Sequence, residues 1–418
     1  MRWLWLCLAL CPACGGGETK GGPASDGGGG AAGAGGSAGA SGAAGGTGGS
    51  AGAGGGAGAG GSCVALPNAD GVDPTVAPEL TVVGDPPAER GTFDPSVEYP
   101  AGAPAGAMSY SAVTATSSIQ TRIAVSSDAG ATWTYVADAN VSAPFQVPVS
   151  SGSSRCPSGT CSGNLVHEVS SLVYDPEDGN AARRWKLFTH SYMVLPGDVL
   201  AYDLGHIAAF SAPEPPGPWV AEGPAIGWTS ESSFSSEGAV AVATNFAQMK
   251  DCIALTEPGA LVRPGGVLDL AVGCVSGPSS IRIELLRSLD HGASWLYAGR
   301  LLSAEDASCF NGRVNAADLF FAGGASHLLA TPAGPTSLGI DGYRGCLVFD
   351  LAGDGTDVAR DGQGRPVVQR VLDAPGQRFI GACSAAEGAS AMGYVASELI
   401  AESPPRIFRM FRSGITPP

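Results

Sequence analysis

Short runs of apolar residues recur along the chain from about residue 108 to the C-terminus, and polar or glycine-rich turns separate them. Most runs alternate apolar and polar positions, which is the period of a half-buried β-strand, and helical periodicity is almost absent. The runs pair into five units of strands joined by turns, so we predict an all-β fold. These units contain, in chain order, residues 108–136, 169–194, 267–288, 318–355 and 388–413.

An eight-residue pattern, Ser-x-Asp-x-Gly-x-x-Trp, occurs twice, as SSDAGATW at 126–133 and as SLDHGASW at 288–295. Strand-like runs flank both copies. We expect the Asp to accept backbone N–H groups and close a turn, the Gly to take a positive φ, and the Trp to pack on the next strand. Each copy therefore predicts the tip of a β-hairpin. The residues that carry the pattern are Ser126, Asp128, Gly130 and Trp133, and Ser288, Asp290, Gly292 and Trp295.

These two copies resemble the Asp-box, or BNR repeat, of sialidase-like β-propellers. The resemblance implies that each box lies at the rim of a blade, between its third and fourth strands, and that its Asp is structural. The segment FSAPEPPGPW at 210–219 occupies the same place in its own unit. It resembles a hairpin of five-bladed glycosidase propellers, which are similar to family 43. The three tryptophans are about 80 residues apart, a spacing that suits a four-stranded blade with long loops.

We therefore predict a five-bladed β-propeller over residues 108–418, with a six-bladed propeller and a β-sandwich as the alternatives. Residues 63–107 are expected to form an irregular N-terminal extension. A propeller closes its ring by pairing the two ends of the chain, and MSYSAV at 108–113 is the candidate strand to join the last blade.

The N-terminal segment 1–14, MRWLWLCLALCPAC, contains one arginine, a short apolar run and cysteines. It is too short to span a bilayer and resembles a bacterial lipoprotein signal, which implies lipid attachment to Cys14, with Cys11 as the alternative. An ordinary cleaved signal and a short anchor are the other interpretations. Residues 15–62 are almost all Gly, Ala and Ser and predict a disordered tether. We expect an exported protein held by lipid on the bacterial outer membrane or cell surface.

The net charge bears on the possible partners of the protein, and the number of cysteines bears on its disulfides. The net charge is −16, with only 22 Lys and Arg and no basic cluster, so nucleic acid is not an expected partner. Eight cysteines follow the signal, and an even number in an exported chain predicts disulfides. A zinc site is the alternative, but no Cys-x-x-Cys pair is present there. The expected pairs are Cys156–Cys161, Cys252–Cys274 and Cys309–Cys346.

Four units begin in the same way, with an acidic residue just ahead of the first strand. If the units are blades, these carboxyls converge at one mouth of the central tunnel. Crowded, desolvated carboxyls have raised pKa values, and glycoside hydrolysis needs one protonated and one ionised carboxyl. The alternative is that each acid caps backbone N–H groups or faces water. The candidate catalytic residues are Glu168, Glu257, Asp318 and Glu387.

Each resemblance also implies a set of site residues. Sialidases use three arginines and a Tyr–Glu nucleophile pair. The candidates are Arg313, Arg344 and Arg378 for the arginines and Tyr343 or Tyr394 for the nucleophile, although the aromatic-Arg-Ile-Pro run of that family is absent. The five-bladed glycosidases use three carboxylates. The segment that begins at His167 and Glu168 reads like their second blade. They also take an acid from the first blade, and Asp94 is the closest residue to supply it.

The other candidate ligands are weaker. His167 could bind a sugar hydroxyl, but the five histidines show no metal-ligand spacing, and we expect no metal or other cofactor. The acidic loop 350–364 could hold structural calcium, although it lacks the register of an EF-hand loop and a plain turn is the favoured interpretation.

These observations lead to two functional hypotheses for a lipid-anchored, monomeric propeller. The first is a glycoside hydrolase whose carboxyls at the tunnel mouth act on a carbohydrate or surface glycan. The second is a non-catalytic module that binds glycan or protein through the same face. The sequence does not specify the sugar, the linkage or the stereochemical outcome.

Overall fold

The computed structural model describes residue 63 and residues 66–71, 77–115, 117–149, 153–227, 246–277, 280–310, 313–335, 341–372, 379–386, 388–389, 391–399 and 408–417. All of these lie in one compact unit. The signal segment, the tether, Cys11, Cys14, Arg378 and Glu387 lie outside the described residues.

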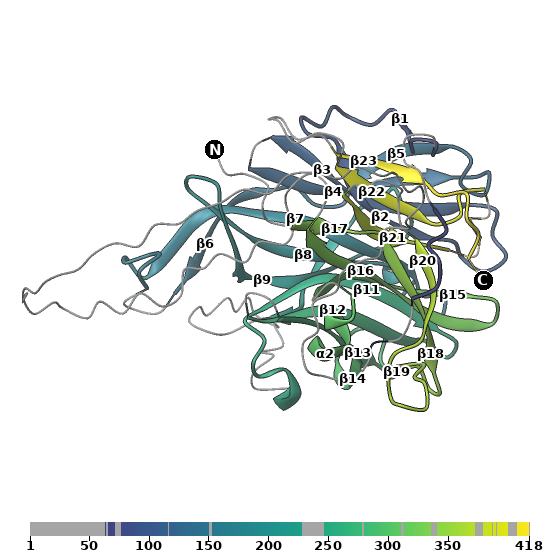
Figure 1. Ribbon diagram of the computed structural model, residues 1–418. Coiled ribbons are helices and arrows are strands. Elements are labelled where there is room, and N and C mark those ends of the chain that lie inside the picture. The colour runs from purple at the N-terminus through teal and green to yellow at the C-terminus, as the bar shows by residue number, and fades with distance from the viewer. Residues whose placement is uncertain are drawn as a thin grey trace, which may run out of the picture. The chain divides into compact units, whose positions relative to one another are not determined.

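The described residues form five sheets, each the blade of a propeller, which confirms the predicted five-bladed fold (Figure 1); the strands pair antiparallel except for β1, which pairs with β5 in parallel. Blade one contains β2 (Thr92–Glu98), β3 (Gly106–Ala115), β4 (Ser118–Ser126), β5 (Trp133–Asp138) and β1 (Val82–Val83). Blade two contains β7 (Thr160–Tyr174), β8 (Trp185–Leu195), β9 (Val199–Ala212), β10 (Val220–Gly227) and β6 (Ala143–Pro148). Blade three contains β11 (Ala254–Arg263), β12 (Val267–Gly277), β13 (Ser280–Ser288) and β14 (Leu296–Leu302). Blade four contains β15 (Arg313–Ala322), β16 (Ala325–Pro335), β17 (Asp341–Tyr343), β18 (Cys346–Ala352), β19 (Asp357–Val358) and β20 (Val368–Leu372). Blade five contains β21 (Phe379–Ser384), β22 (Val395–Leu399) and β23 (Phe408–Arg412).

One strand of each blade lines a common axis. Strand β2 lies beside β7, β7 beside β11, β11 beside β15, β15 beside β21, and β21 beside β2. Helix is limited in the described chain to α2 (Ala304–Ser308) and two short 3-10 turns, η1 (Ala181–Arg183) and η2 (Ala247–Met249). The ring therefore needs only sheet-on-sheet packing between neighbouring blades.

The N-terminal segment closes the ring, at a place other than the one we expected. The Leu80 amide donates to the Met410 carbonyl at 2.9 Å, and the Arg412 amide donates to the Pro78 carbonyl at 3.0 Å, so this segment extends the sheet of blade five beyond β23. In Figure 1 the yellow strands β22 and β23 accordingly lie next to the blue strands of blade one. The prediction for 108–113 was wrong, because these residues lie inside β3, the second strand of blade one.

Strand β2 is the element that sequence patterning missed. We assigned its residues to an irregular extension, yet they form the innermost strand of blade one, so the propeller starts before residue 108. The difference between the predicted extension and the observed strand has a local cause. Asp94 and Pro95 interrupt the alternation at a β-bulge, where the pairing with β3 shifts between Phe93 and Ser96.

The same bulge occurs in every innermost strand, and each time a non-glycine residue takes a positive φ. The pairing of β2, β7, β11, β15 and β21 with its neighbour shifts at this point. A bulge re-aims the side chains beside it, so five equivalent bulges redirect side chains at one level of the tunnel. The residues with positive φ are Asp94 (51°), Val169 (45°), Glu257 (49°), Ala316 (45°) and Ala382 (48°).

Both copies of the repeated octapeptide connect the third and fourth strands of a blade, in blades one and three. In the first copy the Gly130 amide donates to Ser126 Oγ at 2.9 Å, and the Thr132 amide donates to Asp128 Oδ1 at 2.9 Å. The second copy repeats these bonds. Each tryptophan packs against the preceding blade in the ring order: Trp133 Nε1 contacts Met392 Sδ of blade five at 3.1 Å, and Trp295 packs edge-on against Phe188 of blade two. The repeat therefore joins blades as well as closing a hairpin.

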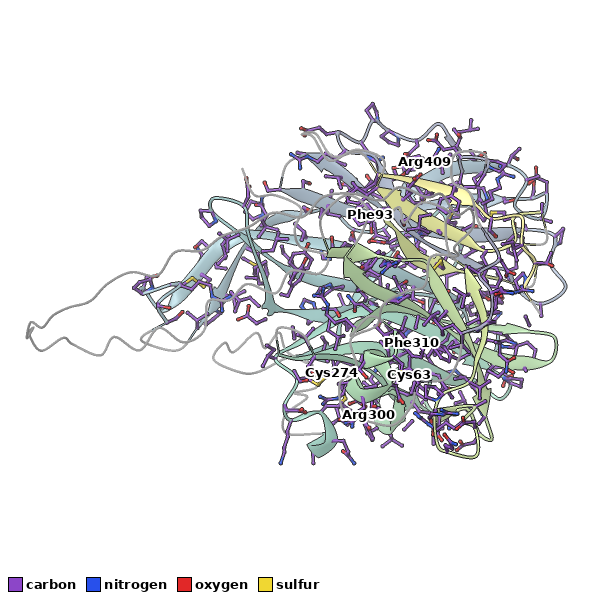
Figure 2. All side chains as sticks on the ribbon, viewed as in Figure 1. Cys63, Phe93, Cys274, Arg300, Phe310 and Arg409 are labelled. Atoms are coloured by element: carbon purple, nitrogen blue, oxygen red, sulfur yellow. A yellow bond between two sulfur atoms is a disulfide. The ribbon has the colours of Figure 1, made fainter. Side chains whose placement is uncertain are left out.

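Four disulfides are present among the described residues. The predictions of Cys156–Cys161 and Cys252–Cys274 are confirmed. The prediction of Cys309–Cys346 was wrong, because Cys346 bonds Cys383 and Cys309 bonds Cys63. The error arose from pairing cysteines close in sequence, whereas Cys346 at the start of β18 faces β21 of the next blade. In Figure 2, Cys63 lies near Phe310, the residue after Cys309.

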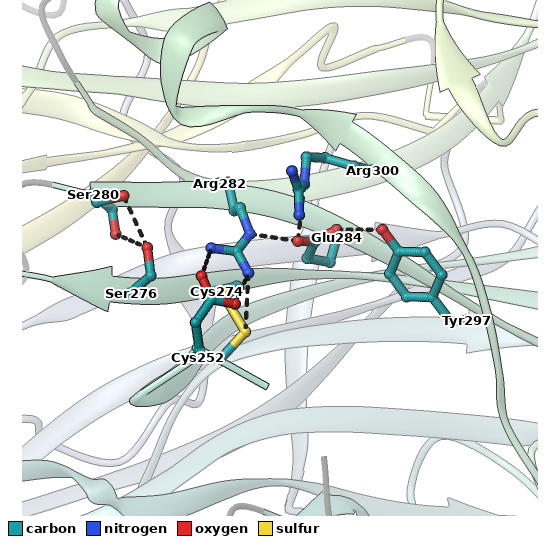
Figure 3. The surroundings of a disulfide bond; sticks show 9 residues. Cys252, Cys274, Ser276, Ser280, Arg282, Glu284, Tyr297 and Arg300 are labelled. Atoms are coloured by element: carbon teal, nitrogen blue, oxygen red, sulfur yellow. Dashed lines mark hydrogen bonds and ion pairs between the residues drawn. A yellow bond between two sulfur atoms is a disulfide. The ribbon is translucent and has the colours of Figure 1, made fainter. Parts of the chain in front are cut away.

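Blade three has a buried ion-pair network next to its disulfide (Figure 3). Glu284, which is fully buried, accepts from Arg282 Nε at 2.5 Å, from Arg300 Nε at 3.0 Å and from the Tyr297 hydroxyl at 2.9 Å. Arg282 also contacts Cys252 Sγ at 3.8 Å. These charges are paired with one another, so loss of one partner would leave an uncompensated buried charge.

Candidate active site in the central tunnel

Three carboxyl groups from three blades meet in the tunnel at the level of the bulges. Asp94 comes from β2, Glu168 from β7 and Glu257 from β11, and each residue is 3 to 4% exposed. Burial raises the pKa of Asp94 well above its ordinary value, and the negative charges of Glu168 and Glu257 raise it further. The three carboxyls therefore share one desolvated environment and interact electrostatically.

Glu257 is the most firmly positioned of the three. Its Oε1 accepts a hydrogen bond from the Tyr343 hydroxyl at 2.6 Å, and its Oε2 accepts one from the Ala316 amide at 2.5 Å. Both donors belong to blade four, so the carboxyl is fixed across a blade boundary. Burial raises the pKa of Glu257 to about 8 despite these two donors, which on their own lower it.

Glu168 and Asp94 differ in their hydrogen bonding. Burial raises the pKa of Glu168 to about 7, and a hydrogen bond with the Tyr192 side chain opposes that rise. The Asp94 amide donates to Ser397 Oγ of blade five at 2.5 Å. Among the described residues Asp94 Oδ2 has no hydrogen-bond partner although it is buried. Asp94 Oδ2 is therefore able to accept a hydrogen bond from a water or to contact a substrate atom.

This arrangement suits acid–base chemistry. A carboxyl with a pKa of about 8 is protonated at neutral pH and can donate its proton, whereas a neighbour that ionises can accept one. Residues from five blades hold the trio: Tyr192 and Glu168 from blade two, Ser397 from blade five, and the others from blades one, three and four. The geometry is therefore a property of the closed ring.

Asp318 lies farther along the tunnel, toward the end of the innermost strands. Its pKa is raised to about 7 by burial, and it raises the pKa of Glu98. A void of about 20 Å³, bordered by both Asp94 and Asp318, separates the two levels. Asp318 and Glu98 also border a larger cavity at that end. The three predicted acids that the structure describes, Glu168, Glu257 and Asp318, therefore do not share one level.

His167 lies on the opposite face of blade two from Glu168. It pairs with Ser191 in the sheet, and its Nδ1 lies 2.7 Å from Ser191 Oγ. Burial lowers the pKa of His167 to about 4, so the ring is neutral at physiological pH. Successive residues of a strand point to opposite faces, which explains why the neighbour of Glu168 in sequence is not its neighbour in the tunnel.

The residues proposed by analogy to sialidases are also separated. Tyr343 reaches the site, but it donates its hydroxyl to Glu257 from a buried position. Arg313 is buried at the start of β15, and the Arg344 backbone amide donates to the Pro332 carbonyl within blade four. In the acidic loop the aspartates pair with arginines: Asp357 with Arg360, and Asp361 with Arg365.

One group of possible metal ligands lies outside the tunnel, at Asp175, Asp178 and His291. Lys186 Nζ lies 2.6 Å from Asp178 and 3.8 Å from Asp175, and His291 Nδ1 lies 2.8 Å from Asp175. A lysine ammonium already occupies the position of a cation. The cluster ties the turn after β7 to the octapeptide loop of blade three.

The sequence contained a signal for Asp94 that we did not use. Asp94 and Glu257 stand at equivalent bulges, and a proline follows each of them, Pro95 and Pro258. Proline has no amide hydrogen to donate, so it is tolerated where a bulge interrupts the ladder. An acid–proline pair at corresponding points of two units therefore marks two of the three acids of the trio, Asp94 and Glu257, but not Glu168, which Val169 follows.

No family model matches the chain, and no curated protein matches it. Solved structures do resemble it. A family 117 glycoside hydrolase of Zobellia galactanivorans is 13% identical, with a TM-score of 0.46, over 80% of this chain and 89% of that one. An endo-1,4-β-xylanase of Bacteroides thetaiotaomicron is 14% identical, with a TM-score of 0.45, over 77% and 90%. The catalytic domain of a family 62 α-L-arabinofuranosidase of Coprinopsis cinerea is 12% identical, with a TM-score of 0.41, over 80% of this chain and 93% of that one.

None of the helices of the described residues has both the length and the hydropathy of a membrane span.

Proposed function

We propose that the protein is a glycoside hydrolase whose reaction uses the tunnel carboxyls Asp94, Glu168 and Glu257. The observation that carries the proposal is the convergence of three buried carboxyls from three blades, with raised pKa values and unequal hydrogen bonding. Glycoside hydrolysis needs one carboxyl to protonate the leaving oxygen and another to attack the sugar or activate water.

The environments of the three groups suggest their roles. Glu257, with a pKa of about 8 and two fixed donors, is the general acid, because it keeps its proton at neutral pH. Asp94, whose Oδ2 has no partner among the described residues, is the nucleophile or the base. Burial is the main cause that opposes the ionisation of Asp94, and Glu168 and Glu257 add no repulsion to it while they hold their protons and carry no charge.

Release of aryl alcohol from a panel of aryl furanosides and pyranosides tests the proposal. Turnover is expected with at least one sugar, and Asp94→Asn and Glu257→Gln are each expected to lower kcat by at least about 10²-fold, because general acid–base groups contribute about 10²–10⁴-fold. Glu305→Gln, an exposed residue of α2, is the matched surface control and is expected to keep full activity.

A second readout separates the roles. An aryl glycoside with a good leaving group needs little protonation, so it should restore activity to Glu257→Gln but not to Asp94→Asn. Equal loss of turnover in both variants whatever the leaving group would contradict the assignment. Glycan binding without turnover, unchanged by either substitution, would favour the non-catalytic binding module.

We also propose that the propeller is exported and held at the bacterial surface by a lipid on Cys14, as the lipoprotein-like signal and the Gly/Ala/Ser-rich tether suggest. Four disulfides in the described chain are consistent with an oxidising compartment. Cys14→Ser is expected to release the protein from the membrane fraction. Unchanged membrane recovery of that variant, with Cys11→Ser released instead, would move the lipid to Cys11.

A further inference from the structure

A second cavity lies at the end of the tunnel where the innermost strands finish. Its volume is about 940 Å³, which lies at the upper end of the usual range for small-molecule sites. Strands from four blades and the segment after β21 of the fifth build its wall, so it lies on the axis of the ring. The residues at these strand ends are Val97 and Glu98, Leu172 and Tyr174, Val262 and Arg263, Phe320 and Phe321, and Ala385 and Ala386.

The wall of this cavity is mostly apolar and aromatic. Rings from three different blades line it, and prolines complete the rim. Phe321 is 41% exposed, which is high for so large an apolar side chain at the rim of a cavity. Such a wall favours a ligand with a hydrocarbon or other apolar body. The aromatic and proline residues are Tyr99, Tyr174, Phe320, Phe321, Pro100, Pro104, Pro176 and Pro264.

Most of the charged groups that face the cavity are acidic. Glu98 and Asp318 lie near the axis, and Glu177 lies on the turn after β7. The single basic residue of the wall is Arg263, and its guanidinium is bound to Asp269 Oδ2 at 3.2 Å and to the Asp354 carbonyl. Its charge is therefore neutralised outside the cavity. Among the described lining residues, no cation is left to balance the three carboxyls.

Glu98 and Asp318 also interact with each other. Burial raises the pKa of Glu98 to about 8, and the charge of Asp318 adds to that rise. Burial raises the pKa of Asp318 to about 7, against hydrogen bonds from Ser384 and from two backbone amides. A positive charge placed between these two carboxyls would relieve both the desolvation and the repulsion.

We propose that this cavity binds a protonated organic amine, with its ammonium group at Glu98 and Asp318 and its apolar body against the aromatic wall. A compact metal ion fits this wall poorly, because hydrated cations need several oxygen ligands and gain nothing from aromatic rings. An aromatic wall attracts an organic ammonium through its ring faces. The site lies beyond the proposed hydrolase centre, since a void of about 20 Å³ bordered by Asp94 and Asp318 lies between the two levels.

Isothermal titration with 1,6-diaminohexane tests the proposal, and 1,6-hexanediol is the uncharged control of the same length. The diamine is expected to bind and the diol not to bind. Binding requires ionised carboxyls, so affinity should rise more than tenfold from pH 6 to pH 8.5, with proton release seen as a dependence of the heat on buffer ionisation. Glu98→Gln and Asp318→Asn are each expected to weaken binding at least tenfold.

Two further variants keep the test independent of folding and of the proposed hydrolysis. Phe321→Ala removes only a partly exposed ring and should weaken binding several-fold with an unchanged melting temperature. Glu257→Gln should bind the diamine as the unmodified protein does, even though it lacks the proposed general acid. Equal binding of the diol, binding of Ca²⁺ in place of the diamine, diamine binding that survives both carboxyl substitutions, or no binding of the diamine would each overturn the proposal.

Discussion

Glu257→Gln should make the protein more resistant to alkaline pH. The raised pKa of Glu257, about 8 against an ordinary value of 4.5, means that the folded protein holds this proton more tightly than the unfolded chain does. Above pH 4.5 the unfolded chain gains stability by losing the proton, so this residue lowers the free energy of unfolding as the pH rises, until about pH 8. Glutamine cannot ionise in either state and removes that dependence.

The size of the effect follows from the two pKa values. Each pH unit between 4.5 and 8 carries about 1.4 kcal/mol of linked free energy. Between pH 5 and pH 8 the penalty from Glu257 therefore grows by about 3 kcal/mol. The substitution also weakens the bonds from the Tyr343 hydroxyl and the Ala316 amide, but that cost is the same at both pH values. This cost therefore cancels when the change in unfolding free energy between the two pH values is compared.

The assay is urea denaturation of both proteins at pH 5 and pH 8, followed by tryptophan fluorescence. Relative to the unmodified protein, Glu257→Gln should gain about 3 kcal/mol in unfolding free energy between the two pH values. The exposed Glu305→Gln should gain less than about 0.5 kcal/mol, as surface substitutions usually do. A gain for Glu257→Gln no larger than that of the control would refute the argument that this carboxyl is desolvated in the folded protein.

Two other predictions concern the same site and the disulfides. Tyr343→Phe removes the hydroxyl that lowers the pKa of Glu257, so the alkaline limb of the pH–rate profile should move up by about one pH unit. A fall in kcat with an unmoved alkaline limb would mean that the tyrosine is only structural. Replacing Cys63 and Cys309 by serine should cost about 3 kcal/mol more in unfolding free energy than replacing Cys156 and Cys161. The reason is that the first disulfide joins residues 246 positions apart in sequence, and the second joins residues 5 positions apart. Equal losses of stability in urea denaturation would contradict that reason.

Local patterns were sufficient to predict the blades. The octapeptide at 126–133 and 288–295 predicted two hairpin tips, and each lies between the third and fourth strands of its blade. Alternating runs located the strands of the other blades for the same reason, since a sheet with one face on each neighbour imposes a period of two. Strand β2 escaped because its bulge breaks that period within seven residues.

Local patterns were insufficient for contacts between blades. The partner of Cys346 is Cys383 on the next blade, and the closing segment 78–80 pairs with β23 more than 300 residues away. The choice between 78–80 and 108–113 as the closing segment depends on where the ring ends, which no local run of residues records. Pairing by proximity in sequence therefore succeeded within blades and failed between them.

The sequence by itself determined the class of the fold and the acids of blades two, three and four, because period, turn chemistry and an acid ahead of a strand are local properties of the chain. Only the tertiary structure decided which acids face one another. Asp94, Glu168 and Glu257 meet at one level of the tunnel, and Asp318 meets Glu98 at another, although all five stand on innermost strands. The physical reason is that a side chain's height and direction on a strand depend on bulges and on the closure of the ring, and both are set by pairing with distant strands.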